Sequence, residues 1–98
     1  MSEERDLSAA FDRLEALLEF PVEFPLKIMG RRVDGFAQAI SDLVLEHAPD
    51  FDPATIELRA SSQGNYLSLT VVVRIDTRAQ LETLYRALST HPMVSVVL

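Results

Sequence analysis

Apolar residues recur every three or four positions between residues 6 and 19, which predicts an amphipathic helix. Its apolar stripe consists of Leu7, Phe11, Leu14 and Leu18. Asp6 is the expected N-cap, because a short carboxylate can accept a hydrogen bond from the free amides of a first turn. We expect the residues before Asp6 to be frayed.

Residues 20–30 alternate as a strand does, with Phe24, Leu26 and Ile28 on one face and Glu23, Lys27 and Met29 on the other. Pro21 and Pro25 cannot donate ladder hydrogen bonds, so the strand is expected to begin at about Leu26. Gly30 is expected to end it at a turn.

A second helix is predicted from Phe36 to Ala48, with Asp34 near its start and Pro49 preventing its continuation. Its residues at helical spacing are Phe36, Ile40, Leu43, Val44 and His47. A third helix is predicted after Thr77-Arg78-Ala79-Gln80, a capping-box pattern in which Thr77 and Gln80 satisfy each other's free amides. Leu81, Leu84, Tyr85 and Leu88 form its stripe, and Pro92 ends it.

Two further alternating runs, residues 55–61 and 66–75, flank Ser62-Gln63-Gly64-Asn65, whose residues tolerate a turn, so they predict a β-hairpin. In the first strand Ile56, Leu58 and Ala60 alternate with Thr55, Glu57, Arg59 and Ser61. In the second, Leu67, Leu69, Val71, Val73 and Ile75 share the buried face, and Tyr66, Ser68, Thr70, Val72 and Arg74 the exposed one. Residues 94–98 predict a short final strand.

Two β-α-β units joined by a hairpin predict an α+β, ferredoxin-like βαββαβ sandwich, in which a four-stranded antiparallel sheet has both helices on one face. The other face is expected to be open and to carry Lys27, Met29, Glu57, Arg59, Tyr66, Ser68, Thr70, Val72, Arg74 and Val97. Residues 20–98 would form this domain, and residues 1–19 a helical N-terminal extension that the fold does not require. Packing of this extension on its own domain is favoured over a dimer contact.

Composition removes several function classes. The 98 residues contain no cysteine, which excludes disulfides, thiolate metal sites and thiol nucleophiles. The net charge of −6 argues against nucleic acid as a partner, and Tyr66 alone is placed where RNA-recognition domains stack bases. The polar N-terminus and the lack of a long apolar run predict no secretion signal and no membrane span, so the cytoplasm is the expected compartment.

Six short runs, in this order and spacing, resemble the YbeD-like family of small bacterial proteins, a domain of unknown function. They are Leu17-Leu18-Glu19-Phe20-Pro21, Lys27-Ile28-Met29-Gly30, His47-Ala48-Pro49, Ser61-Ser62-Gln63-Gly64-Asn65-Tyr66, Leu84-Tyr85 and Val97-Leu98. The resemblance covers residues 14–98. It implies a ferredoxin-like fold similar to the ACT regulatory domains, which bind amino acids or other small effectors, often across paired domains.

Two places are candidate binding sites. The loop Ser61, Ser62, Gly64, Asn65, with Arg59 and Tyr66 beside it, could bind an anion or a partner through hydroxyls and amides. Ordinary hairpin chemistry explains the same residues and is the favoured interpretation. Gly30 and Arg31, with Arg32 before a helix start, resemble the place where ACT domains receive an effector, and suit a carboxylate. A plain glycine turn with surface arginines is the simpler alternative.

No pattern predicts catalysis or a bound metal. His47 and His91 fall near helix C-termini, where they act as stop signals, and no acidic cluster has ligand spacing. We therefore expect no enzyme activity and no cofactor. The leading hypothesis is a non-catalytic regulatory or protein-binding module, with a protein partner or a homodimer. The alternative is an ACT-type sensor of an amino acid or carboxylate.

Overall fold

A computed structural model describes the backbone of residues 3–98 and the side chains from residue 7 onward, except that of residue 15. Its elements in chain order are α1 (Glu3–Leu17), β1 (Val22–Arg31), α2 (Phe36–His47), the 3-10 helix η1 (Pro53–Thr55), β2 (Glu57–Ala60), β3 (Tyr66–Ile75), α3 (Arg78–Ser89) and β4 (Val96–Val97). The order of helices and strands is the one that the hydrophobic pattern predicts.

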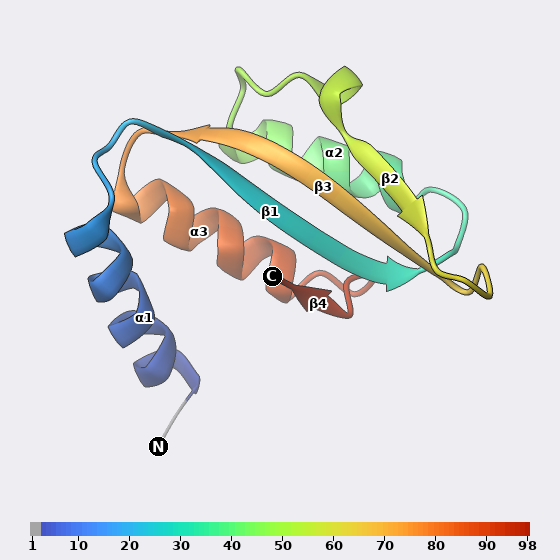
Figure 1. Ribbon diagram of the computed structural model, residues 1–98, viewed down its shortest axis with the longest axis horizontal. Coiled ribbons are helices and arrows are strands. Elements are labelled where there is room, and N and C mark those ends of the chain that lie inside the picture. Colours follow the sequence, from blue (N-terminus) through green and yellow to red (C-terminus); the bar gives the residue numbers. More distant parts are fainter. Residues whose placement is uncertain (1–2) are drawn as a thin grey trace.

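The strands form one antiparallel sheet in the order β2-β3-β1-β4 (Figure 1). β1 and β3 pair along their full length, from Val22 opposite Ile75 to Arg31 opposite Tyr66. β2 adds to the outer side of β3, and β4 to the outer side of β1. The predicted α+β, ferredoxin-like sandwich is confirmed.

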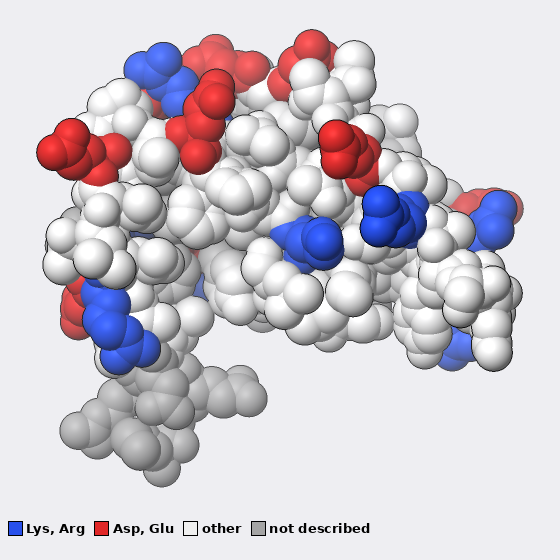
Figure 2. Space-filling view, in the orientation of Figure 1, with Lys and Arg blue, Asp and Glu red and all other residues white. Residues whose placement is uncertain are grey.

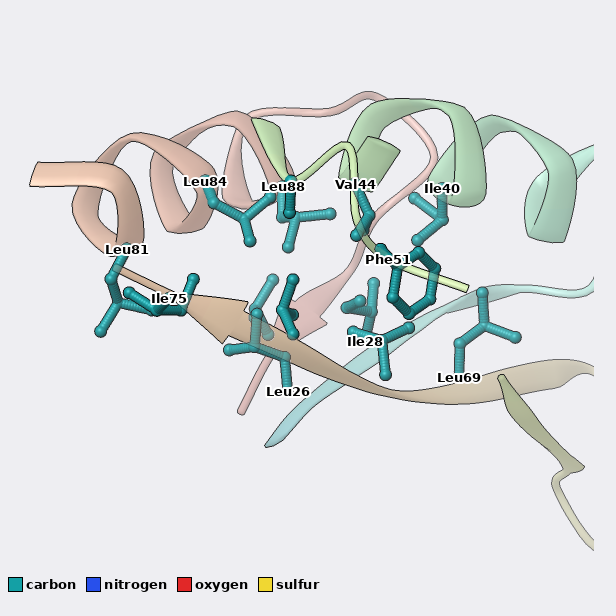
Figure 3. Close-up of a cluster of buried hydrophobic side chains, with 14 of the residues drawn as sticks. Leu26, Ile28, Ile40, Val44, Phe51, Leu69, Ile75, Leu81, Leu84 and Leu88 are labelled. Carbon is teal, nitrogen blue, oxygen red and sulfur yellow. The ribbon is translucent and has the colours of Figure 1, made fainter. Parts of the chain in front are cut away.

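The core lies between the sheet and the two helices α2 and α3, which cover the same face (Figure 3). Ile40 and Val44 of α2 and Leu81, Leu84 and Leu88 of α3 point toward the sheet. The sheet contributes six buried side chains to the same core: Leu26, Ile28, Leu69, Val71, Val73 and Ile75. Every second residue of β1 and β3 therefore packs into this core, and the residues between them lie on the opposite face of the sheet.

β1 begins at Val22 rather than at about Leu26, so the expectation that Pro25 delays the strand is wrong. Lys27 donates to and accepts from the backbone of Leu98, so alternate residues of β1, Pro25 among them, direct their backbone groups toward the β4 side. The pairing with β4 stops at Lys27. A backbone N–H at position 25 would therefore point past the end of β4, where no described strand could accept its hydrogen bond. Proline is tolerated at this position because it removes no hydrogen bond between β1 and β3.

The two edge strands, β2 and β4, are shorter than predicted. Residues 53–55 form the 3-10 turn η1, in which Pro53 fits the first position and Asp52 Oδ1 accepts from the Ala54 amide at 3.0 Å, so β2 starts at Glu57 and not at Thr55. β4 is Val96–Val97 instead of residues 94–98. Val97 pairs with the buried Ile28 and is itself buried, so the prediction that Val97 lies on the open face is wrong. Val96, which pairs with Met29, lies on that face instead.

Gln80 joins α3 to α2. The Gln80 amide donates to Thr77 Oγ1 at 3.1 Å, as predicted, but Gln80 Oε1 accepts from the amide of Asp76 at 2.7 Å instead of that of Thr77. Gln80 Nε2 also donates to the carbonyl of His47 at 3.0 Å, at the C-terminus of α2. The helix start is thus capped, and a free carbonyl of the neighbouring helix is satisfied by the same side chain.

The N-terminal helix α1 packs on its own domain (Figure 1). The buried ring of Phe11 meets Tyr85 of α3 edge to face, with ring centroids 5.9 Å apart, and Asp12 forms an ion pair with Arg78. An apolar cavity of about 210 Å³ lies between α1, β1 and α3. The helix starts at Glu3, before the expected N-cap Asp6, and the two residues that precede it lie outside the described part of the chain.

Phe11→Ala tests whether α1 is an integral part of the fold. We expect the free energy of unfolding, measured by urea denaturation, to fall by about 3 kcal/mol, since a large buried ring is removed. Leu17→Ala, at the exposed end of the same helix, is the control and should change it by less than about 0.5 kcal/mol. Equal effects of the two substitutions would show that α1 does not contribute to the core.

Candidate functional site

The face of the sheet that α2 and α3 leave uncovered is held in register by the central ladder. One row across it runs from Arg59 through Ser68 and Met29 to Val96, and the next from Glu57 through Thr70 to Lys27. Arg31 lies opposite Tyr66 at the end nearer the β2–β3 hairpin. Figure 2 looks onto this face, which we call the open face.

A hollow of about 340 Å³ lies at the hairpin end of the open face. We call it the hairpin pocket; its lining includes Met29, Arg59, Ser61, Tyr66, Ser68 and Val96. Three of these, Arg59, Ser61 and Tyr66, are among the predicted site residues. Tyr66 and Val96 are 48% and 41% exposed, so large apolar surfaces border the hollow. A polar hollow of about 250 Å³, lined by residues that include Lys27, Glu57 and Thr70, adjoins it.

The basic side chains at the hairpin end of the sheet have no acidic partner among the described residues. Among the described side chains, ion pairs join Arg74 to Asp76, Arg78 to Asp12 and Glu82, and Arg86 to Glu82. Lys27, Arg31, Arg32 and Arg59 take part in none. In Figure 2 basic side chains lie across the middle and right of the open face, whereas most acidic ones lie at its left and upper rim. This end of an acidic protein is therefore locally positive.

The hairpin loop is explained largely by its own hydrogen bonds. The Ser61 amide donates to the Tyr66 carbonyl at 2.9 Å, and Ser61 Oγ accepts from the Tyr66 amide at 3.2 Å. Gly64 has φ of +75°, which an L-residue rarely adopts, and its amide donates to the Ser61 carbonyl at 2.9 Å. The Asn65 carbonyl accepts from the Arg32 amide, and Ser62 is exposed. Of the four loop residues predicted as a site, Ser61 lines the hairpin pocket.

Gly30 is a packing residue. It is buried, and a Cβ there would lie 2.8 Å from the ring of Phe36 and closer still to the carbonyl oxygen of Met93. Its neighbours Arg31 and Arg32 point to opposite sides of the sheet: Arg31 lies on the open face, and Arg32 lines a hollow at the start of α2. There Gly35, with φ of 83°, precedes the helix without a side-chain cap. The structure therefore separates three residues that sequence proximity had grouped.

Several pocket residues were not predicted as site residues. Met29 and Ser68 were predicted to lie on the open face but not to belong to a binding site. The other unpredicted lining residues, which were not expected on that face, are Ala60, Leu67, Ser95 and Val96. Val96 lies on the open face because its neighbour Val97 pairs with the buried Ile28, and the sequence of this short strand carries no signal of that pairing.

The described side chains include no group of three or more acidic or histidine residues that could hold a metal ion. His91 Nδ1 accepts from the Met93 amide at 3.1 Å, and His47 is the last residue of α2. Within the described range, no helix has the length and apolar character that a membrane crossing requires.

The topology, with two helices on one face and an open sheet opposite, defines an ACT-like, ferredoxin-like α+β protein. The fold is similar to the ACT domain from GTP pyrophosphokinase of Chlorobium tepidum, with a TM-score of 0.54 and 17% identity over 79% of this chain and 97% of that one. At this identity the likeness shows the fold alone.

Residues 15–98 match the model of a family described as a protein of unknown function, DUF493, so the chain belongs to that family. A UPF0250 protein of Bordetella pertussis is 54% identical over 84 residues, 86% of this chain and 92% of the relative. One of Ralstonia nicotianae is 50% identical over the full length of both chains. The resemblance to the YbeD-like family is thereby confirmed. The match to the Ralstonia protein also includes α1, most of which the family model omits.

Gly30→Ala tests the packing role of Gly30. We expect the free energy of unfolding to fall by about 3 kcal/mol, because the new methyl group collides with the backbone at Met93 and the buried ring of Phe36. Gly35→Ala is the matched control: nothing lies near its Cβ position, so only the positive φ costs energy, about 1 kcal/mol. A Gly30→Ala variant as stable as the Gly35→Ala variant would contradict this role.

Proposed function

We propose that this protein is a non-catalytic regulatory module of the cytoplasm that binds a protein partner at the hairpin pocket. The single observation that carries the proposal is the combination of exposed apolar side chains with unpaired cations. Tyr66, Met29 and Val96 supply the apolar surface, and Lys27, Arg31 and Arg59 surround it.

This arrangement has the composition of a protein interface. Stable interfaces combine an apolar centre with a polar rim, and tyrosine and arginine are enriched among the residues whose loss weakens binding most. The partner that fits is a segment with aliphatic side chains for the floor at Met29 and Val96 and carboxylates for the basic rim. Charge complementarity favours such a segment, because the protein as a whole is acidic and this end of its sheet is not.

A small-molecule sensor of the ACT type is the second candidate. The observation in its favour is the same set of unpaired arginines, since a guanidinium binds a carboxylate through two parallel hydrogen bonds. Such a ligand would contact Arg31 on the open face or Arg32 near the start of α2, and not the buried Gly30.

Photo-crosslinking in cells tests the protein-binding module. A photoreactive phenylalanine analogue at position 66, on the pocket, should yield a defined crosslinked partner, and the same group at Val33, equally exposed but off the open face, should not. Arg31→Glu should lower the crosslinked yield at least tenfold, because it repels an acidic segment. Arg13→Glu makes the same charge change on α1 and should leave the yield unchanged. A yield insensitive to Arg31→Glu would reject the site.

A thermal-shift screen of the purified protein separates the two candidates. Amino acids, carboxylates, nucleotides and central metabolites are added at millimolar concentration, and the protein-binding module predicts no change in Tm. A ligand present at about a hundred times its Kd would add roughly 2.7 kcal/mol and raise Tm by on the order of 10 °C. A carboxylate that does so, and loses its effect in Arg31→Ala or Arg32→Ala, would establish the sensor instead.

A further inference from the structure

The open face carries exposed apolar side chains in a second place besides the hairpin pocket. Val72 of β3 lies opposite Pro25 of β1, and both are exposed on this face. We call this pair the distal patch. Val72 is 48% exposed, the same fraction as Tyr66, which it follows by six positions in β3. At about 3.4 Å per residue, roughly 20 Å of strand separates the two apolar surfaces.

A continuous trough leads from the hairpin pocket toward the distal patch. The hairpin pocket and the polar hollow beside it share Arg59 and Ser68 in their linings. The polar hollow extends to Lys27 and Thr70, and the next open-face pair along the ladder is the distal patch. Lys27 forms no ion pair with a described side chain, and Glu57 lies at the other end of its row, two strands away. A positive charge therefore stands between two apolar surfaces.

We propose that the partner segment is an amphipathic α-helix that lies along β1 and β3 and covers both apolar surfaces, an inference that rests on the protein-binding function proposed above. At a rise of 1.5 Å per residue, a helix needs about 13 residues, nearly four turns, to pass from Tyr66 to Val72. Its contact stripe recurs every three or four residues. The stripe presents aliphatic side chains at both ends and a carboxylate to Lys27 between them, so it complements the face in polarity and in charge.

The backbone of the partner decides between a helix and an extended segment. β1 and β3 pair with each other along their full length, and their backbone groups point sideways within the sheet, so the open face offers side chains only. An extended segment on that face would leave its N–H and C=O groups unpaired over the apolar surfaces, which costs free energy. A helix satisfies these groups internally, and the opposite face of the same sheet already packs against α2 and α3 (Figure 3). Extended peptides bind a sheet at its edge instead.

Two crosslinking positions measure the shape of the bound segment. A photoreactive phenylalanine analogue is placed at position 66 of the full chain in one strain and at position 72 in another, and mass spectrometry identifies the crosslinked residues of the partner. A helix predicts that both positions capture the same protein, at residues about 13 apart in its sequence. An extended segment covers the same distance at about 3.4 Å per residue and would give a separation of about six residues.

Val72→Lys and Lys27→Glu test the two contacts that lie beyond the hairpin pocket. Each should lower the crosslinked yield through position 66 at least tenfold, because the first places a charge against an aliphatic side chain and the second repels a carboxylate. Val33→Lys and Arg13→Glu are the matched controls and should leave the yield unchanged, since Val33 is equally exposed but off the open face and Arg13 is exposed on α1. Circular dichroism confirms that each variant is folded.

A synthetic peptide of the captured segment gives an independent measurement with the purified protein. On binding, the peptide should gain the far-ultraviolet circular dichroism of a helix. Proline at its centre should weaken binding at least tenfold, because it removes a helical hydrogen bond and clashes with the preceding turn, whereas alanine at the same position should not.

The outcomes separate the helix from the protein-binding function. A partner captured through position 66 but not through position 72, or captured at residues about six apart, would overturn the helix and leave the protein-binding function standing. A yield that is insensitive to both Val72→Lys and Lys27→Glu would do the same, as would a peptide that binds without gaining helicity. The absence of a defined partner at position 66 would overturn the protein-binding function and the helix together.

Discussion

The antiparallel ladder between β1 and β3 determines where every other part of this molecule lies. Its register assigns Leu26, Ile28, Leu69 and Val71 to the helix side and Met29, Arg31, Tyr66 and Ser68 to the open face. A slip of one residue would exchange the two sets, exposing the core and burying arginine, so the hydrophobic effect enforces the register that also builds the hairpin pocket. β2 and β4 then add to the two outer sides of an already fixed pair.

Sequence patterns predict the parts of this fold that depend on local periodicity. α2, α3 and β3 follow the expected bounds closely, because a long run of alternating or helically spaced residues leaves one arrangement that buries the apolar set. The errors lie where a distant element decides. Pro25 is tolerated because β4 ends short of it, and Val97 is buried because it pairs with Ile28; neither fact can be read from its own segment.

The candidate site was predictable to a similar extent. Arg59 and Tyr66 stand at open-face positions of an alternating hairpin, and both line the pocket. Val96 depends on the register of the short final strand, which two residues are too few to reveal. Gly30 illustrates the opposite error. A glycine beside two arginines suggests a ligand loop, but the close approach of the Met93 carbonyl and the Phe36 ring explains it, and that approach exists only in three dimensions.

The closeness of Gly30 to Met93 has a further consequence for the pocket. The turn between α3 and β4 rests directly on the backbone of β1 and is held there by the Ser95 amide, which donates to the Met29 carbonyl at 2.7 Å. Val96 follows immediately, so one wall of the hairpin pocket is fixed to the centre of the sheet. The partner proposed for this pocket would therefore meet a wall that needs no ordering on binding, and little conformational entropy would be lost on that side.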